Sequence, residues 1–351
     1  MARKNSRDEE KMNYPAELRR LKEEGPQRLY LLWGPEDYLR EQYLAQLKKR
    51  CLPEGEDSFS YKRLDGPELD RQELVGAIDA VPFMTERSFV EIRDVELNRL
   101  KEPEKYMAVF SDIPEYCTVC LVQSAQFEPD GRLKLIKTLR SVARELKFTQ
   151  QSQGMLIDWI IRRFAAAGKS VELEAAQRLM FISGDLMSRL IPEIEKIAAF
   201  AKGERVTAAD VEAVANHIPE AVFFDMTDFI SQKKYNTAAS VLAELLADKN
   251  NEPIPMLAML GLQMRKLYTA RLAIERELGA KFVMEVCSIK HEFIAKKLIN
   301  SSRGFSLSQL RRAVALCAEA DYKMKSSSLD GRELLKETVM RIAAGETDAE
   351  R

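Results

Sequence analysis

Short strand-like segments alternate with amphipathic segments over the first 148 residues. Four segments have the length of buried strands, as apolar runs bounded by turn residues or as alternating sequences; they lie at residues 28–33, 59–64, 88–92 and 118–122. Between the second and third, Leu74, Ala77, Ile78 and Val81 follow helical spacing and predict one apolar helix face. Strands that alternate with helices predict an α/β domain with a parallel sheet.

Beyond this region the apolar positions recur at helical spacing, with no strand pattern. Glycines and Pro219 divide the helices into a smaller and a larger group. Pro192 falls inside the third helix of the smaller group, where a proline costs about 3 kcal/mol and removes a hydrogen bond. We therefore expect a kink or a later helix start there. The predicted order is an N-terminal extension 1–25, an α/β domain 26–148, a small helical domain 149–216, a larger helical domain 217–345 and a tail 346–351.

Composition narrows the class of protein. A chain of 351 residues is too long for one compact core. Its 54 Lys and Arg balance 55 Asp and Glu, whereas a protein that held duplex DNA alone would carry a basic excess. Any DNA contact is therefore expected to be local or shared with partners. The chain has no apolar leader, no apolar run near the ~20 residues of a membrane span, and five scattered cysteines, which together indicate a cytoplasmic protein.

The turn after the first predicted strand resembles a degraded P-loop. An ATPase P-loop reads G-x-x-x-x-G-K-[ST], in which Lys reaches the phosphates and Ser/Thr binds Mg²⁺. Gly34 has the right place between a strand and a helix, but Leu39 replaces the second glycine, Arg40 the lysine and Glu41 the hydroxyl residue. On local sequence alone, an ordinary strand–helix turn is the alternative. In either case we expect no nucleotide cofactor and no intrinsic ATPase activity.

Metal or redox chemistry is not expected either. Cys117 and Cys120 form a lone C-x-x-C without a second pair or a nearby His, and a zinc site needs about four ligands. His217 and His291 each lack a neighbouring Cys or His.

Five stretches, taken in order, resemble the delta subunit of DNA polymerase III, a bacterial clamp-loader component. They are Leu31–Leu39, Pro82–Val90, Gly184–Ile197, Val222–Ile230 and Ala320–Lys325. The resemblance covers about residues 28–345 and implies an AAA+-like module without a working nucleotide site. It further implies a small helical lid and a helical collar that oligomerises with other loader subunits. In the collar, Leu257, Leu260 and Met264 are candidates to face other subunits, with packing inside their own domain as the alternative.

Phe83 and Met84 lie between the end of a predicted helix and the third strand. By resemblance, a pair of large apolar residues here inserts into a hydrophobic pocket of the beta sliding clamp, although Met84 stands where the family often has an aromatic residue. Without the resemblance, both residues filling the local core is the alternative. The implied function is to bind the clamp and open its ring for loading onto primed DNA, within the DNA polymerase III holoenzyme. The implied partners are the clamp, the tau/gamma and delta-prime subunits, and primer–template DNA.

Two other functions stay open. An active AAA+ ATPase is disfavoured by Arg40 and Glu41 at the phosphate and metal positions. A stator like the delta-prime subunit would supply an arginine finger from a Ser-Arg-Cys motif, whereas Gln123-Ser124-Ala125 stands after the fourth strand.

Overall fold

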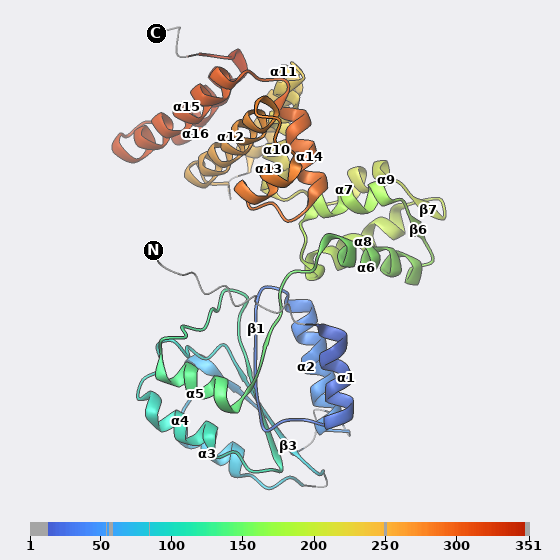
Figure 1. The fold of residues 1–351 in the computed structure, drawn as a ribbon, viewed down its shortest axis with the longest axis vertical. Helices are drawn as coiled ribbons and strands as arrows, with labels where there is room; N and C mark the ends of the chain where they lie inside the picture. The colour runs from blue at the N-terminus through green and yellow to red at the C-terminus, as the bar shows by residue number, and fades with distance from the viewer. Residues whose placement is uncertain (1–12, 54, 56–58, 84, 249–250, 348–351) are drawn as a thin grey trace. The chain divides into compact units, whose positions relative to one another are not determined.

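The computed structural model describes residues 13–53, 55, 59–83, 85–248 and 251–347. The chain forms two compact units (Figure 1). The first comprises residues 1–151 with 186–188, and the second comprises residues 152–185 and 189–351. Met84, the first twelve residues of the predicted extension and the last four of the predicted tail lie outside the described residues. Within the described part of the chain, no helix is both long and apolar enough to span a membrane.

The first unit is built on a five-stranded parallel sheet with the order β2-β3-β4-β1-β5. Its strands are β1 Leu29–Trp33, β2 Tyr61–Asp65, β3 Ser88–Arg93, β4 Cys117–Val122 and β5 Arg144–Lys147. The four predicted strands and the parallel α/β class are confirmed. Strand β5 was not predicted because it reads Arg-Glu-Leu-Lys, and an edge strand with one buried residue carries almost no apolar signal.

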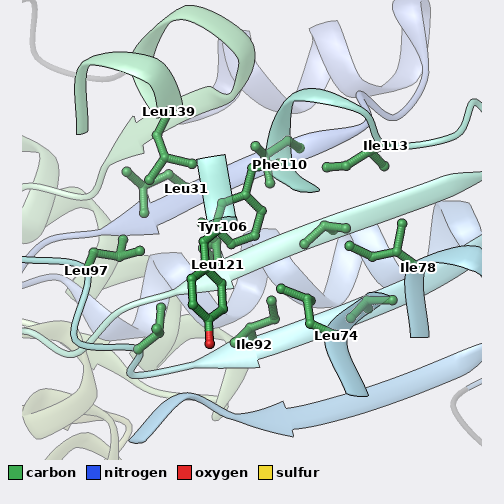
Figure 2. Packing of buried hydrophobic residues seen from close by; sticks show 14 of the residues in the cluster. Leu31, Leu74, Ile78, Ile92, Leu97, Tyr106, Phe110, Ile113, Leu121 and Leu139 are labelled. Atoms are coloured by element: carbon green, nitrogen blue, oxygen red, sulfur yellow. The ribbon is translucent and has the colours of Figure 1, made fainter. Parts of the chain in front are cut away.

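Helices cover both faces of this sheet. They are α1 Tyr14–Glu24, α2 Asp37–Cys51, α3 Arg71–Asp79, α4 Pro103–Ser111 and α5 Lys134–Val142. Helices α1 and α2 pack together on one side, and α3, α4 and α5 form a row on the other (Figure 1). Figure 2 shows the core between that row and the sheet, where Leu74, Ile78, Tyr106, Phe110 and Leu139 meet the strands. Burial of this apolar surface holds the sheet and helices together.

Helix α3 ends earlier than its apolar spacing predicts. Leu74 and Ile78 are buried as expected, but the helix ends at Asp79. Val81 therefore lies beyond the helix and is 77% exposed, so its predicted place on the apolar face is wrong. Pro82 explains the early end, because the residue before a proline is driven out of the helical conformation.

The second unit is mainly helical. Its helices are α6 Gln153–Ala166, α7 Leu173–Ser183, α8 Met187–Phe200, α9 Ala208–Val214, α10 Pro219–Ser231, α11 Tyr235–Ala247, α12 Pro253–Glu275, α13 Ala280–Val286, α14 Glu292–Ser302, α15 Leu307–Ser326 and α16 Gly331–Ala344. Two strands of two residues, β6 Ser170–Val171 and β7 Arg205–Val206, pair in parallel. The prediction of helices alone missed this pair because two residues show no periodicity.

Helix α12 is the centre of the larger helical group and packs against α14 and α15. Leu257, Leu260 and Met264 on this helix are almost fully buried within the unit. The suggestion that these residues face other subunits is therefore wrong, and they fill the core of their own chain.

Helix α8 begins before Pro192 and continues past it to Phe200, so the expected later start is wrong. Leu190, Ile194 and Ile197 are buried on either side of the proline. Burial of these side chains offsets the missing backbone hydrogen bond. A kink at Pro192 stays a prediction.

Candidate functional site

The turn after β1 is closed against the chain that follows β5. Gly34 has φ 117°, in the region that favours glycine. A Cβ atom on Gly34 would lie 2.5 Å from the carbonyl oxygen of Phe148. The N–H of Glu36 donates to that same oxygen over 3.0 Å. In a P-loop, the backbone of this turn wraps around phosphates. Here the same turn packs against the backbone of Phe148.

We expect Gly34→Ala to lower the free energy of unfolding by about 2–4 kcal/mol, since it adds both a backbone clash and an unfavourable φ. Gly76→Ala is the matched control, because a Cβ there meets no atom within 4 Å and lies in helix α3. That control should be neutral or stabilising by up to about 1 kcal/mol. Urea unfolding of both variants measures the difference, and equal midpoints would contradict the close packing of this turn.

Arg40 points back at this turn. Its side chain is buried, and its Nη1 donates to the carbonyl oxygen of Gly34 over 2.7 Å. Leu39, at the second glycine position, is also buried. A P-loop lysine directs its charge toward a phosphate. The Arg40 guanidinium instead forms a hydrogen bond with the backbone of the turn itself.

Glu41 occupies the hydroxyl position and forms a two-pronged ion pair with Arg93. The two Arg93–Glu41 N–O distances are 2.9 and 2.8 Å. Arg93 also donates to Glu91, which is fully buried in β3. The Arg93 guanidinium therefore lies between two carboxylates, one of which, that of Glu41, stands at the sequence position of the P-loop's Mg²⁺-binding hydroxyl residue.

Glu91 accepts two further polar contacts. Lys48 Nζ lies 2.9 Å from its carboxylate, and the Tyr61 hydroxyl donates over 2.9 Å. Burial alone would raise the pKa of Glu91, but the hydrogen bonds from Lys48 and Arg93 outweigh burial and lower it. The Glu41 hydrogen bond, opposed by burial, raises the pKa of Arg93. The sequence alone does not link Glu91 and Arg93 to Glu41 and Lys48, because nothing local identifies these residues as partners.

Phe83 lies near the amino ends of the strands, whereas Gly34 lies at their carboxyl ends. It precedes β3, whereas Gly34 follows β1, and all strands of the sheet are parallel. Its side chain is 62% exposed, so the alternative that it fills the local core is wrong. Phe59 precedes β2, and its ring meets that of Phe83 edge-to-face, with 6.2 Å between ring centres. Phe59 was not predicted as a surface residue because its alternating sequence placed it in a strand.

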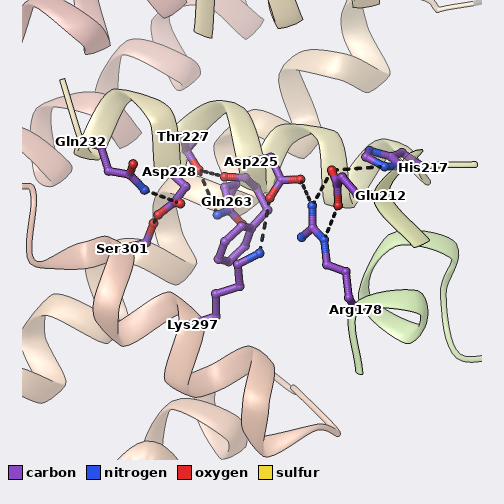
Figure 3. A network of polar contacts seen from close by, with 11 residues as sticks. Arg178, Glu212, His217, Asp225, Thr227, Asp228, Gln232, Gln263, Lys297 and Ser301 are labelled. Carbon is purple, nitrogen blue, oxygen red and sulfur yellow. Dashed lines mark hydrogen bonds and ion pairs between the residues drawn. The ribbon is translucent and has the colours of Figure 1, made fainter. Parts of the chain in front are cut away.

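The second unit carries a polar network between α7, α9, α10 and α14 (Figure 3). Arg178 bonds Glu212 over 2.6 and 3.0 Å and Asp225 over 3.0 Å. His217 Nε2 lies 3.7 Å from Glu212, so Glu212, His217 and Asp225 converge closely enough to be considered as metal ligands. Because Arg178 already bridges the two carboxylates, their charge is compensated without a metal ion.

The remaining His and Cys candidates are structural. His291 is buried and pairs through Nε2 with Asp185 over 3.2 Å. Cys117 and Cys120 lie in β4 with no exposed surface. Burial raises the pKa of both thiols, which makes them poor nucleophiles and ligands.

Comparisons with known proteins identify the family. The family model described as DNA polymerase III, delta subunit matches residues 30–149, and a second model, for the C-terminal domain of the DNA polymerase III delta subunit, matches residues 220–342. The DNA polymerase III subunit delta of Bacillus subtilis is 24% identical over 90% of this chain and 92% of its own length. The probable DNA polymerase III subunit delta of Aquifex aeolicus is 22% identical over 89% of this chain and 90% of its own length.

A solved structure agrees at the level of the fold. The Bacillus subtilis DNA clamp loader delta protein aligns with a TM-score of 0.54 and 22% identity, over 94% of this chain and 99% of that one. Two family models that together span most of the chain, with curated relatives aligned over about nine-tenths of it, show that this chain belongs to the DNA polymerase III delta subunit family.

Proposed function

We propose that this chain binds the beta sliding clamp and opens its ring for loading onto primed DNA, without hydrolysing ATP itself. The observation that carries the proposal is the exposure of Phe83, an aromatic side chain that lies 62% open to solvent next to the exposed ring of Phe59. Exposed aromatic residues grouped on one surface are typical of protein-binding sites. Phe83 and Met84 are the proposed clamp-binding residues.

The proposed mechanism is differential binding. A protein can shift a ring from closed to open only by binding the open ring, or a strained interface, more tightly. Phe83 and Met84 would enter an apolar pocket of the clamp, and the helix that precedes them, α3, would press on one clamp interface. ATP binding in neighbouring loader subunits would control access to these residues, because the Gly34 turn of this chain already contacts Phe148 and Arg40.

The contacts around Gly34 support the absence of nucleotide binding. Arg40 bonds the turn's own carbonyl, and Glu41 is held by Arg93. A bound nucleotide would have to break both contacts and place phosphates beside the buried Glu36 carboxylate. These contacts disfavour the alternative of an active AAA+ ATPase. No described contact favours a stator like the delta-prime subunit.

The chain that follows the α/β domain is proposed to act as two functional parts. Residues 149–216 would be the lid, and residues 217–345 the collar that joins the tau/gamma and delta-prime subunits in the loader. Primer–template DNA would contact the assembled complex and not this chain alone, in line with the formal charge of −1. The proposed place of action is the cytoplasm, where the loader would meet the replicating DNA.

Calorimetric titration of the full chain with its cognate clamp tests the function, with Mg²⁺-ATP as a parallel ligand. We expect saturable binding of the clamp and no heat of nucleotide binding. Absence of clamp binding by a folded protein would remove the proposal. Binding of ATP at millimolar concentration would restore the ATPase alternative.

A further inference from the structure

Three large apolar side chains are exposed together beside the amino ends of β2 and β3. Phe59 is 93% exposed, Val81 77% and Phe83 62%. They come from two loops that are distant in the sequence but precede neighbouring strands. We call Phe59, Val81 and Phe83 the apolar cluster. Hydration of such exposed apolar surface is unfavourable, and the free energy is recovered when a partner covers it.

The hydroxyl of Ser60 ties the two loops together. Ser60 is buried, and its Oγ accepts from the N–H of Phe83 over 3.0 Å and lies 3.2 Å from the Phe83 carbonyl oxygen. Thr85 Oγ1 lies 2.7 Å from the same Ser60 oxygen. The carbonyl of Ser60 accepts from the N–H of Phe89 in β3. Because Phe59 and Ser60 are adjacent, these bonds hold the Phe59 backbone at a set position relative to Phe83.

A groove of about 380 Å³ lies beside the apolar cluster, between β2 and α3. Phe59 and Val81 form part of its wall, and Gly76, Ala77 and Ala80 form the wall on the side of α3. Small side chains leave room there, and a Cβ added at Gly76 would meet no atom within 4 Å. The groove is also lined by Lys62 and Glu73, which form an ion pair. The surface thus places exposed aromatic rings beside a recess with small apolar walls and a charged pair, which suits a partner whose apolar pocket has a rim of mixed polarity.

We propose that Phe59 is a further clamp-contacting residue, and that the two loops bind the clamp as one surface in which the groove receives an apolar side chain from the rim of the clamp pocket. The proposal rests on the proposed function of Phe83, with which it is continuous. Phe59 enters the interface alongside Phe83. Loss of the Phe59 ring therefore removes a contact with the clamp and also the edge-to-face contact that helps to orient the Phe83 ring.

Titration of the clamp with Phe59→Ala, Phe83→Ala and the double variant tests this inference. Phe59→Ala should weaken clamp affinity by about tenfold. The double variant should lose less than the product of the two single losses, because the two rings contact each other. Phe200→Ala, which truncates an exposed phenylalanine of the second unit, is the matched control and should bind like the parent chain.

Thermal unfolding distinguishes a loss of clamp affinity from a loss of stability. Phe59 is almost fully exposed, so Phe59→Ala should keep the parent midpoint, and Phe59→Leu should keep most of the affinity as well. Parent affinity in Phe59→Ala together with weak binding by Phe83→Ala would overturn the role of Phe59 and leave the proposed function standing. Parent affinity in both single variants and in the double variant would remove the proposed clamp site itself.

Discussion

Replacing Phe83 and Met84 together by alanine should lower clamp affinity by at least about 100-fold. Burying each large apolar side chain contributes roughly 1.5–3 kcal/mol, and every 1.4 kcal/mol is tenfold in affinity. Phe83 is exposed in the free chain, so its truncation removes surface from the interface and not from the core. The part of the affinity loss that comes from Phe83 should therefore appear without a loss of stability. Calorimetric titration against the clamp measures the first quantity, and thermal unfolding the second.

The same variant should also fail to release clamps from nicked circular DNA, because ring opening requires the differential binding that these two residues would supply. Phe200→Ala again serves as the control for truncating an exposed aromatic residue. Unchanged clamp affinity in a folded Phe83→Ala, Met84→Ala protein would contradict the assignment of these residues.

Glu91→Gln should lower the free energy of unfolding by about 2–3 kcal/mol at pH 7. Glu91 is fully buried and is held by Lys48, Arg93 and Tyr61, so a neutral side chain removes the negative charge that faces Lys48 and Arg93, although Arg93 keeps its ion pair with Glu41. The expected loss is at the low end for a buried pair, since Lys48 and Arg93 keep some access to water. Urea unfolding measures it.

The pH dependence of this loss has a definite sign. The pKa of Glu91 in the folded chain is lowered from 4.5. Its ionisation therefore stabilises the fold above about pH 4.5, and this contribution is lost as the pH falls through the lowered folded pKa. The stability difference between the parent chain and Glu91→Gln should shrink over that acid range. A difference that stays constant would show that the charge of Glu91 is not its cause.

Glu115→Gln is the matched control for this experiment. Glu115 also pairs with an arginine, Arg28, but its side chain is 86% exposed. Exposed ion pairs contribute little because water and salt screen them. The control should change stability by less than about 0.5 kcal/mol. A loss as large as that of Glu91→Gln would mean that burial does not distinguish the two pairs.

The strands of the α/β unit were predictable where burial makes them continuously apolar. Strands β1 and β4 are buried along their whole length, so their composition alone identifies them. Strand β5 has one buried side chain and was not predictable in the same way. The end of α3 shows a related limit. The apolar spacing continues to Val81, but the helix ends at Asp79 because Pro82 drives the residue before it out of the helical conformation.

The candidate site was predictable in its chemistry but not in its contacts. The sequence shows Leu39, Arg40 and Glu41 in place of the groups that bind phosphate and Mg²⁺, because a P-loop is a contiguous motif. It does not show that Glu41 meets Arg93, since the two are 52 positions apart in the sequence. Only the tertiary fold brings such groups together.

The sequence by itself therefore determined the four continuously patterned strands and the change to helices after them, the loss of the nucleotide-binding groups and the family resemblance, because these depend on residue type and local spacing. The tertiary structure decided that Phe83 faces solvent, that Phe59 lies beside it and that Arg93 pairs with Glu41. The physical reason is the order and direction of the strands. Because β2 and β3 are parallel neighbours, the loops that enter them meet at the amino ends of the strands, while the turn after β1 lies at the carboxyl ends.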